Sequence, residues 1–516
     1  MTNYARTVLD CAARNATLPA IVTDGHVMDF GTLADRVRAL ASALATDGFG
    51  HCDGLAVCVQ NRPEFVEALL AAWALGGYVA PINPRLHPSE CAYQISDSRA
   101  RFLVTSPTEP ALGAVTEGDL HRILLVGKEV PTGPGTMSYE DAVQQHLGTA
   151  VDPDEGVDDE PMWLFYTSGT TGRPKGVVWT HRVFATASAL HAADMYPAGP
   201  DDGILVAAPA THGAGIVAIF GLSRGAKVVF TPTGVKPTPD VILETVEAYR
   251  PTALFLTPTI VTMLRTASSF RGRDLSSLRS IIYGGSSMPV ADLQAAIDDF
   301  PGVDFVQMYG QGECCTVISV LTAEDHRRAA RDPALAGRLA SAGVARSLTE
   351  LAVVDDARNR LPAGEIGEIV VRGPATAIGY WQAPDLTAQT FTDGWVHTGD
   401  VGRIDEFGYV FIVDRKKDMV ISGGMNVSTR EIEDALNSHH AVVDSAVIGV
   451  PHPVFGESVC AVVVSSSPVT PEDLTAHVTA RLAVFKKPQR YEFVDELPKN
   501  STGKVQKAVL RAMYRL

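Results

Sequence analysis

Short apolar runs alternate with amphipathic stretches along the first two thirds of the chain. The runs are rich in Val, Ile, Leu and Phe, as buried strands are. They lie at residues 55–59, 102–105, 123–126, 204–207, 227–230, 253–256 and 280–283. The segments between most of them are helical in pattern. Strands that alternate with helices predict an α/β fold with largely parallel, layered sheets.

Two local signals near the N-terminus predict where elements begin and end. Asp24-Gly25 divides the apolar stretch 20–30 and is typical of a hairpin turn. Thr32 to Asp35 fits a capping box, which predicts the start of a helix there. That helix would bury the apolar residues at its inner face, which are Leu33, Val37, Leu40 and Leu44.

The pattern changes twice toward the C-terminus. After Ala330, strand-like runs at 351–354, 366–372, 395–397 and 409–413 follow one another without long helices, which predicts a small β-barrel-like subdomain. After the basic segment 414–417 the pattern becomes that of a compact α+β module. We therefore expect a large N-terminal domain over 1–413, a hinge at 414–417 and a small C-terminal domain over 418–516.

Composition and charge remove several classes of protein. The chain has 516 residues, is 46% apolar and carries 59 acidic against 43 basic residues, a formal net charge of −16. That balance disfavours a nucleic-acid partner. No apolar run approaches the roughly 20 residues of a membrane span. The N-terminus lacks a signal-peptide pattern, and the seven cysteines are scattered. These features predict a cytoplasmic protein with reduced thiols.

The most informative segment is YTSGTTGRPKG, residues 166–176. Glycines let backbone N–H groups approach an anion, the hydroxyls add donors, and Lys175 supplies a positive charge. This is the chemistry of a triphosphate-binding loop. It is not the common P-loop, because Arg173-Pro174 precede the lysine and no Ser or Thr follows it. An ordinary Gly/Thr hairpin would explain the glycines but not the clustered hydroxyls and cation.

Four further segments carry candidate chemistry. Tyr309-Gly310-Gln311-Gly312-Glu313 ends an apolar run and offers a carboxylate that could hold Mg²⁺. Thr398-Gly399-Asp400 offers a carboxylate for ribose hydroxyls, although an aspartate in a turn often only caps its own backbone. The basic segment 414–418 lies at the expected hinge. The segment 498–504 ends in Lys504, which could reach a developing negative charge.

These five segments, in this order, resemble the adenylate-forming superfamily of acyl- and aryl-CoA synthetases, peptide synthetase adenylation domains and luciferases. The resemblance covers essentially the whole chain. It implies an ATP-dependent ligase in which a carboxylate attacks the α-phosphate of ATP, giving an acyl-adenylate and pyrophosphate. A thiol then displaces AMP. It also implies a mobile C-terminal domain that rotates between the two half-reactions.

The resemblance assigns a role to each motif residue. The loop Thr167, Ser168, Gly169, Thr170, Thr171 and Lys175 would hold the β- and γ-phosphates, and Glu313 would bind Mg²⁺. Gly284, Gly285, Ser286, Tyr309 and Gly310 would surround the adenine of ATP or AMP. Asp400 and Arg415 would hold the ribose, and Lys504 would stabilise the charge that develops as the adenylate forms. Lys417 would be the hinge residue.

The thiol acceptor is expected to be coenzyme A. The stretch 421–427 resembles the ISGGxNV of CoA ligases, in which Gly423 and Gly424 would let pantetheine pass close to the backbone. A carrier-protein thiol stays open as the alternative acceptor. A homodimer is also left open.

The acyl pocket is expected beside the phosphate and adenine loops. His212 stands where relatives have a gating aromatic residue or histidine, although a histidine satisfied by backbone at a helix start fits equally well. Small residues at 213–215, 284 and 310 suggest a roomy pocket and hence a bulky, cyclic or aryl acid, with a fatty acid not excluded.

Gly312 departs from the family pattern, which has a threonine before the magnesium glutamate. A missing charge-assisted hydrogen bond costs about 1.5–3 kcal/mol. Slow adenylation, room for a bulky acid, or compensation by a neighbouring hydroxyl would each account for the glycine. The departure also supports an alternative function, namely an enzyme specialised in transferring a preformed acyl-adenylate to CoA.

Two rival classes compete with the ligase. Gly213, Gly215 and Ala218 match a dinucleotide-binding fingerprint, which would indicate an NAD-dependent oxidoreductase. The next strand, 227–230, ends in Thr-Pro-Thr rather than in the acidic residue that the fingerprint requires. A non-catalytic nucleotide-binding protein is the other rival, against which the joint presence of Lys175, Glu313 and Lys504 argues.

Overall fold

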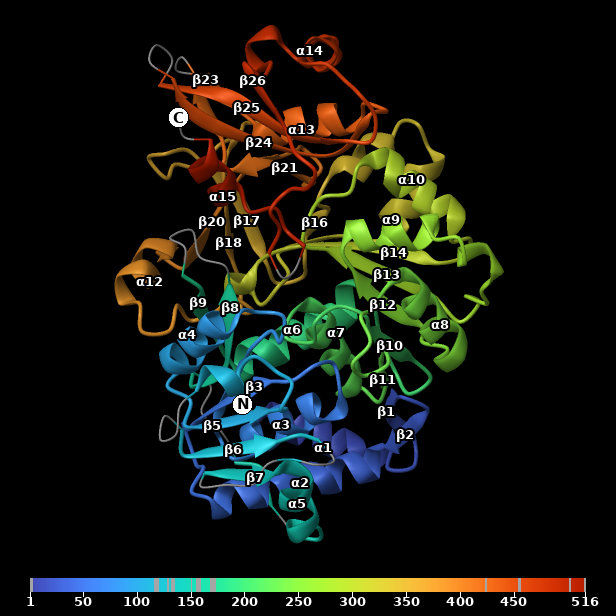
Figure 1. Ribbon diagram of the computed structural model, residues 1–516, viewed down its shortest axis with the longest axis vertical. Helices are drawn as coiled ribbons and strands as arrows, with labels where there is room; N and C mark the ends of the chain where they lie inside the picture. Colours follow the sequence, from blue (N-terminus) through green and yellow to red (C-terminus); the bar gives the residue numbers. More distant parts are fainter. Residues whose placement is uncertain are drawn as a thin grey trace. The chain divides into compact units, whose positions relative to one another are not determined.

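The structure is a computed structural model (Figure 1). It describes residues 3–115, 120–127, 130, 135–149, 151–154, 159–167, 173–422, 425–452, 456–500 and 503–514. The chain forms two compact units. Unit 1 contains residues 1–350 and 371–396, and unit 2 contains residues 351–370 and 397–516. The predicted domain boundary at 413/414 lies inside unit 2 and stays a prediction.

Unit 1 is built around two sheets with parallel centres. The nine-stranded sheet has the order β16 (Val344–Ala345), β15 (Ser319–Leu321), β14 (Asp304–Tyr309), β13 (Ser280–Gly284), β12 (Ala253–Leu256), β10 (Gly203–Val206), β11 (Lys227–Phe230), β1 (Pro19–Thr23) and β2 (His26–Asp29). The seven-stranded sheet has the order β7 (Thr136–Ser138), β6 (Arg122–Leu125), β5 (Phe102–Thr105), β3 (Gly54–Cys58), β4 (Tyr78–Pro81), β8 (Pro161–Thr167) and β9 (Lys175–Thr180).

The strands that alternate with helices pair in parallel, as predicted. In the larger sheet the pairs from β1 through β14 are parallel, and the edge pairs β1–β2, β14–β15 and β15–β16 are antiparallel. In the smaller sheet only the pair β8–β9 is antiparallel. Because parallel strands end at the same edge, the loops that follow β13 and β14 lie side by side.

Helices cover the two sheets of unit 1. They are α1 (Tyr4–Arg14), α2 (Phe30–Thr46), α3 (Pro63–Ala74), α4 (Pro88–Ser98), α5 (Tyr139–His146), α6 (His181–Asp194), α7 (Gly213–Leu222), α8 (Pro239–Tyr249), α9 (Pro258–Thr266), α10 (Val290–Asp299), α11 (Ala323–Arg331) and α12 (Pro384–Thr390). Figure 1 shows α2 packed beside α5. One apolar core joins residues of both sheets and centres on buried aromatic side chains, among them Trp163, Trp179 and Phe184.

The helix predicted to begin at a capping box of Thr32 to Asp35 begins earlier, so that prediction is wrong. Asp29 is the N-cap, and its carboxylate accepts a hydrogen bond from the Thr32 N–H at 2.7 Å. A carboxylate satisfies a free N–H and also favours the positive end of the helix dipole, so Asp29 starts the helix directly after β2. The hairpin around Asp24-Gly25 is confirmed by the pairing of β1 with β2.

Unit 2 carries two smaller sheets. The first contains β17 (Glu350–Val354), β18 (Gly367–Arg372), β20 (Trp395–Ile404) and β21 (Val410–Arg415). The first two residues of β20, Trp395 and Val396, belong to unit 1 and pair there with β19 (Phe391–Thr392). This first sheet is the small β-barrel-like subdomain that the sequence predicted. The second contains β23 (Met425–Val427), β22 (Val420–Ser422), β25 (Gly456–Ser465), β24 (Val442–His452) and β26 (Arg490–Phe493). It packs with α13 (Thr429–Asn437), α14 (Pro471–Thr479) and α15 (Lys507–Met513).

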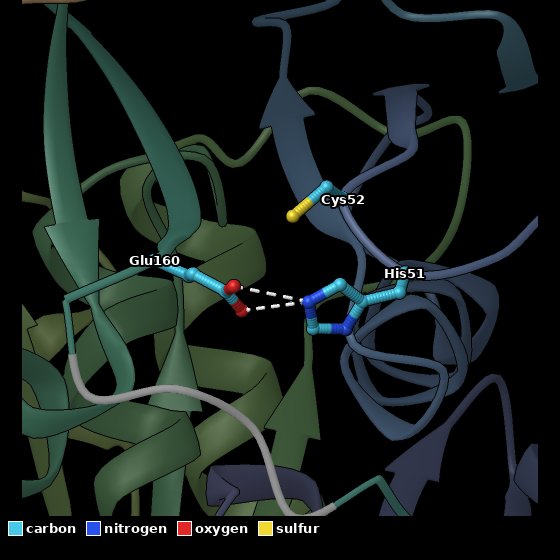
Figure 2. A group of neighbouring side chains, drawn as sticks. All are labelled: His51, Cys52 and Glu160. Carbon is cyan, nitrogen blue, oxygen red and sulfur yellow. Dashed lines mark hydrogen bonds and ion pairs between the residues drawn. The ribbon is translucent and has the colours of Figure 1, made fainter.

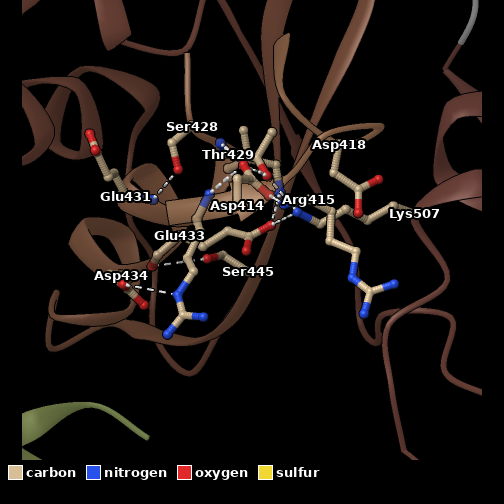
Figure 3. A network of polar contacts seen from close by, with 12 residues as sticks. Asp414, Arg415, Asp418, Ser428, Thr429, Glu431, Glu433, Asp434, Ser445 and Lys507 are labelled. Atoms are coloured by element: carbon tan, nitrogen blue, oxygen red, sulfur yellow. Dashed lines mark hydrogen bonds and ion pairs between the residues drawn. The ribbon is translucent and has the colours of Figure 1, made fainter. Parts of the chain in front are cut away.

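A polar network holds the predicted hinge to the C-terminal elements of unit 2 (Figure 3). The buried Asp414 carboxylate accepts hydrogen bonds from the Thr429 N–H at 2.6 Å and the Thr429 hydroxyl at 2.8 Å. The Lys507 ammonium donates to the same hydroxyl at 2.7 Å and pairs with Glu433 at 2.7 Å. The start of α13 is therefore fixed by charged groups from three segments of unit 2.

Candidate active site

The predicted phosphate loop connects two antiparallel strands of unit 1. β8 ends at Thr167 and β9 begins at Lys175, and these two residues are paired across the ladder. The run before the loop and the run after it therefore form strands, as predicted. The loop residues Ser168, Gly169, Thr170 and Thr171 lie outside the described residues.

A tyrosine that the sequence did not indicate joins two of the predicted site residues. The Tyr380 hydroxyl donates a hydrogen bond to Glu313 Oε1 at 2.6 Å. The Lys175 ammonium lies 5.9 Å from the centre of the Tyr380 ring. Tyr380 also forms a backbone bridge with Val177 of β9. The structure thus places Lys175 near the ring of Tyr380 and Glu313 at its hydroxyl.

Glu313 is a buried carboxylate in a short turn after β14. It is 8% exposed, and the 3₁₀ turn Gly312–Cys314 places it. No ion pair with a cation of the described residues compensates its charge. Burial and the neighbouring Glu313 carboxylate raise the pKa of Tyr380 far above its usual value, so this hydroxyl keeps its proton. Glu313 can therefore offer its remaining oxygen lone pairs to a hard cation.

The glycines of the predicted adenine site are required by close packing. A Cβ atom on Gly284 would lie 2.5 Å from the Met308 carbonyl oxygen, and one on Gly310 would lie 2.2 Å from that of Thr316. Gly285 has a φ of +86° with open space on its Cβ side. Because β13 and β14 are parallel neighbours, Gly285 and the exposed Ser286 lie at the same sheet edge as Tyr309.

Gly312 and Phe165 fit together. A Cβ atom on Gly312 would lie 2.8 Å from the Phe165 ring and 3.0 Å from the Thr167 methyl group. The Phe165 ring is stacked on Trp179 with centroids 4.5 Å apart, and the Trp179 indole N–H donates to the Gly312 carbonyl at 2.7 Å. The space beside Gly312 is therefore filled by an aromatic ring, so the prediction that the glycine makes room for a bulky acid is wrong at this point.

His212 stands at the first turn of α7 and is neutral. Burial lowers the pKa of its imidazole to about 4. Its Nδ1 lies 2.8 Å from the Thr211 hydroxyl, and its ring meets Phe165 edge-on at 5.8 Å. The side chain makes no capping hydrogen bond to α7, so the interpretation of a backbone-satisfied helix-start histidine is wrong. His212, Phe165 and Gly312 form one continuous wall in unit 1.

The predicted ribose pair forms in unit 2. Asp400 and Arg415 are paired across β20 and β21, and Arg415 Nε lies 2.8 Å from Asp400 Oδ1. Asp400 is buried and Arg415 is partly exposed. The same unit holds Lys504 near this pair. Lys504 is an exposed residue, yet the protein crowded around its ammonium and the positive charge of Arg415 lower its pKa to about 8.

The remaining predicted residues of unit 2 are partly described. Lys417 is exposed, and its backbone carbonyl accepts a hydrogen bond from Arg511 at 3.3 Å. Gly423 and Gly424 connect β22 and β23 and lie outside the described residues. Cys314 and Cys315 are buried in unit 1.

A separate cluster of His51, Cys52 and Glu160 places ligand atoms within 4.8 Å of one another (Figure 2). His51 Nε2 lies 3.0 Å from Glu160, and His51 Nδ1 lies 3.1 Å from Asp154. Both ring nitrogens thus have a carboxylate partner. The hydrogen bond to Glu160 is the main cause that raises the pKa of His51. A histidine held between two carboxylates by hydrogen bonds explains the cluster without a metal.

The fold, the site residues of unit 1 and the site residues of unit 2 together agree with one enzyme family. The chain belongs to the AMP-binding enzymes: the model of that family matches residues 9–381, and the model of its C-terminal domain matches residues 431–504. These are adenylate-forming enzymes, and the chain belongs with the AMP-forming acid–CoA ligases among them. ATP, a carboxylic acid and CoA are the substrates of this class.

Individual relatives match over almost the whole chain. A feruloyl-CoA synthase of Amycolatopsis sp is 35% identical over 502 residues, covering 96% of both chains. The amide bond synthetase McbA from Marinactinospora thermotolerans has a TM-score of 0.88 at 31% identity, with 99% of both chains covered. The anthranilate CoA ligase AuaEII, in complex with anthranoyl-AMP, has a TM-score of 0.87 at 27% identity over 99% of this chain and 97% of its own.

Family membership settles the rival interpretations of the sequence. The NAD-dependent oxidoreductase is excluded, and the glycines that suggested it have a packing reason. A Cβ atom on Gly215 would lie 1.9 Å from the Ala210 carbonyl oxygen, so α7 begins against the preceding turn.

In the described part of the chain, no helix is both long enough and apolar enough to cross a membrane.

Proposed function

We propose that the enzyme activates an aryl or similarly bulky carboxylic acid with ATP and passes the acyl group to CoA. The observation that carries the proposal is the arrangement of Lys175, Tyr380 and Glu313. Lys175 begins the strand that follows the phosphate loop, and Tyr380 lies close to both Lys175 and Glu313. The arrangement offers a cation and a buried carboxylate whose protein partner is a neutral hydroxyl. A phosphate chain with its metal ion needs both groups.

In the first step, an oxygen of the acid's carboxylate attacks the α-phosphorus of ATP. The bond from that phosphorus to the bridging oxygen of pyrophosphate breaks, and pyrophosphate leaves with the electron pair. Lys175 and the loop that begins at Thr167 would hold the β- and γ-phosphates. Glu313 would hold Mg²⁺, for which a carboxylate oxygen is a suitable ligand. Lys504 would stabilise the charge that builds on the reacting oxygens.

The ribose and the adenine of the nucleotide would be held by different residues. Asp400 would accept hydrogen bonds from the ribose hydroxyls, with Arg415 fixing its orientation through their ion pair. Gly284, Gly285, Ser286, Tyr309 and Gly310 would form the adenine site. Gly284 packs against the Met308 backbone and Gly310 against the Thr316 backbone, which fixes the two loops that would carry the site.

In the second step, the CoA thiol attacks the acyl carbonyl carbon. The bond between that carbon and the oxygen of AMP breaks, AMP leaves, and the thiol proton goes to solvent. Lys417 would be the hinge about which the C-terminal domain rotates between the steps. Gly423 and Gly424 would line the path of pantetheine.

The wall of His212, Phe165 and Gly312 supports the proposed acid class. Phe165 lies against His212 and is stacked on Trp179. Because His212 is neutral at physiological pH, this wall suits a planar ring better than a charged group. The relatives named for feruloyl-CoA synthesis and anthranilate activation support an aryl acid.

Acid-dependent exchange of radiolabelled pyrophosphate into ATP, measured without CoA, tests the proposal. The panel contains cinnamic and benzoic acids, bulky polycyclic acids and fatty acids of matched concentration. We expect exchange with aryl acids and thioester formation once CoA is added. If only fatty acids support exchange, the aryl assignment is refuted. If none of the acids supports exchange, adenylation is refuted.

The absence of a hydroxyl at Gly312 favours one second candidate, an enzyme specialised in the CoA step. Such an enzyme would give no exchange with any acid, yet it would convert a synthetic aryl-adenylate and CoA to the thioester and AMP. Measuring both reactions on one preparation separates the two functions. Ordinary exchange rates would exclude the second candidate.

A further inference from the structure

A charged side chain is buried in unit 1 with two of its nitrogen atoms unpaired among the described residues. Arg346 is 4% exposed, and its Nε and Nη2 atoms have no hydrogen-bond partner among the residues that the structure describes. A buried guanidinium without a hydrogen-bonded counter-charge is strongly disfavoured, because it loses its hydration and gains nothing in return. Its position therefore calls for a group that the described residues do not supply.

The backbone fixes Arg346 in this position. Gly343 has a φ of +79°, and a Cβ atom there would lie 2.0 Å from the Val320 backbone, so only glycine fits the turn into β16. The Arg346 N–H donates to the Ile318 carbonyl at 3.3 Å. Arg346 thus enters the core because the tight pairing of β15 with β16 leads it there.

The carboxylate of Asp194 acts on the charge of Arg346 but is hydrogen-bonded to another residue. Asp194, at the end of α6, accepts hydrogen bonds from the Ser347 N–H at 2.9 Å and the Ser347 hydroxyl at 2.6 Å. In the described part of the chain it forms no ion pair with Arg346. Burial lowers the pKa of Arg346 below its usual value, but a guanidinium still keeps its proton at neutral pH.

A second unpartnered polar side chain lies beside it. His191 of α6 is 3% exposed, and neither of its ring nitrogens has a hydrogen-bond partner among the described residues. Burial is the main cause that lowers the pKa of His191 to about 3, and the charge of Arg346 adds to it. The imidazole is therefore neutral and has one N–H to donate. Its ring packs on Phe220 of α7 at 5.6 Å.

The elements that carry this pair also carry the active-site residues. α6 follows β9, which begins at Lys175, and α7 begins directly after His212. Cys314 and Cys315, whose thiols lie within the electrostatic reach of Arg346, directly follow Glu313. We infer that Arg346 and His191 bind an anionic group, most simply a second carboxylate, at the far end of the acid substrate. This inference rests on the proposed function and names the substrate class more closely.

The physical reason is the geometry of the guanidinium. Its planar fork matches the two oxygens of a carboxylate, and the pair is strong where water is excluded. A site built for such a group also rejects the analogue that lacks it, because its own donors would then stay unpaired. The activated carboxyl would be the one beside Glu313, and the second would anchor the ring.

A matched pair of aryl acids tests the inference. Para-carboxycinnamate carries the second carboxylate, and para-nitrocinnamate is its neutral isostere. We expect wild-type enzyme to adenylate the dicarboxylate with kcat/KM roughly 100-fold above the nitro acid. Arg346→Met should remove this preference and leave adenylation of the nitro acid unchanged or improved. Arg346→Lys, which keeps the charge but loses the fork, should give an intermediate preference.

A nearby cation provides the control. Arg224 also acts on the charge state of His191, but its Nε already donates to the Ala198 carbonyl at 3.0 Å. Arg224→Gln should leave the preference intact. Equal preference in wild-type and Arg346→Met enzyme, with the nitro acid adenylated by both, would overturn this inference and leave the proposed function standing.

Direct binding decides the question if turnover is absent. Calorimetric titration of para-carboxycinnamate into the wild-type protein should give binding that Arg346→Met weakens roughly 100-fold. Equal binding by the two proteins, or no binding, would overturn the inference. An Arg346-dependent rise in melting temperature with chloride or phosphate, without any acid preference, would show a trapped inorganic ion instead and would equally overturn it.

Discussion

Two groups of charged residues, one in each compact unit, differ in how the protein itself partners them. In unit 2, Asp400 pairs with Arg415, and Glu433 pairs with Lys507. In unit 1, the partner of Glu313 is a neutral hydroxyl, and no ion pair reaches Arg346 among the described residues. A paired charge fixes structure, whereas an unpaired buried charge is kept for a ligand. Glu433 and Lys507 stabilise the fold, whereas Glu313 and Arg346 are proposed to bind ligands. Asp400 combines the two, because its pair with Arg415 orients a carboxylate that is proposed to bind the ribose.

Lys504 of unit 2 is proposed to act on the substrate, and its removal should have the largest effect. We predict that Lys504→Ala lowers adenylation at least 100-fold, because a preorganised charge near the reacting phosphate is lost. The melting temperature should stay unchanged. Pyrophosphate exchange measures this loss, and a loss confined to thioester formation would contradict the assigned role.

The same residue predicts a pH dependence. The pKa of Lys504 is about 8, so its ammonium is charged below that pH and neutral above it. Adenylation should therefore fall as the pH rises through about 8. Lys504→Arg should retain part of the activity and lose this dependence. Parallel pH profiles for the two proteins would show that another group titrates.

A structural charge of unit 2 should affect stability but not substrate binding. Asp414→Asn keeps the size of the side chain and weakens its hydrogen bonds to Thr429. We expect a loss of about 1.5–3 kcal/mol in the free energy of unfolding of unit 2. Urea denaturation measures it, with the KM for the acid as the control. A changed KM with unchanged stability would place Asp414 among the ligand-binding residues.

In unit 1 the pair Gly312 and Phe165 should resist restoration of the family's threonine. Gly312→Thr forces a side chain against the Phe165 ring and should cost about 1–3 kcal/mol of stability. Phe165→Val should relieve part of that cost in the double variant, giving a coupling energy of about 0.5–3 kcal/mol. Additive effects in thermal denaturation would show that the two positions are independent.

A smaller effect is expected at Tyr380. Tyr380→Phe removes the hydrogen bond to Glu313 and leaves the ring beneath Lys175. The KM for ATP should rise by about threefold to tenfold, since one hydrogen bond contributes about 0.5–1.5 kcal/mol. Titration with Mg²⁺ at fixed ATP gives the measurement, and an unchanged Mg²⁺ requirement would separate Tyr380 from the metal site.

The smallest effect concerns the exposed His51 cluster. The folded-state pKa of His51 is raised, so its contribution to stability is present below its unfolded pKa and is lost as the pH rises through the folded value. Glu160→Gln should lower stability by less than about 1 kcal/mol in mildly acidic solution and leave it unchanged at alkaline pH. A difference that persists at alkaline pH would point to uncharged contacts.

Elements with strong local patterns could be predicted from the sequence. The apolar runs are strands in the structure, and the Asp24-Gly25 hairpin is present. Asp400 and Arg415, which the family resemblance grouped, lie opposite each other on neighbouring strands. The helix start at Asp29 was missed, since a carboxylate directly after a strand can cap a helix as well as a threonine inside it.

Residues whose role depends on tertiary contacts could not be predicted in this way. Tyr380 lies in a loop remote in sequence from Glu313, and no local pattern connects the two. The sequence around Arg346 is typical of an exposed position and does not predict its burial. The turn at Gly343 leads the residue into the core. The fit between Gly312 and Phe165 likewise depends on a close approach that spacing does not reveal.

Transfer of heavy oxygen from the acid tests the central claim most directly. The acid is labelled in its carboxyl group and converted with ATP and CoA, and the products are analysed by mass spectrometry. If the carboxylate attacks the α-phosphorus, one labelled oxygen stays on AMP when the thiol displaces it. The account predicts labelled AMP and unlabelled pyrophosphate. Label in inorganic phosphate, with ADP as the nucleotide product, would contradict it.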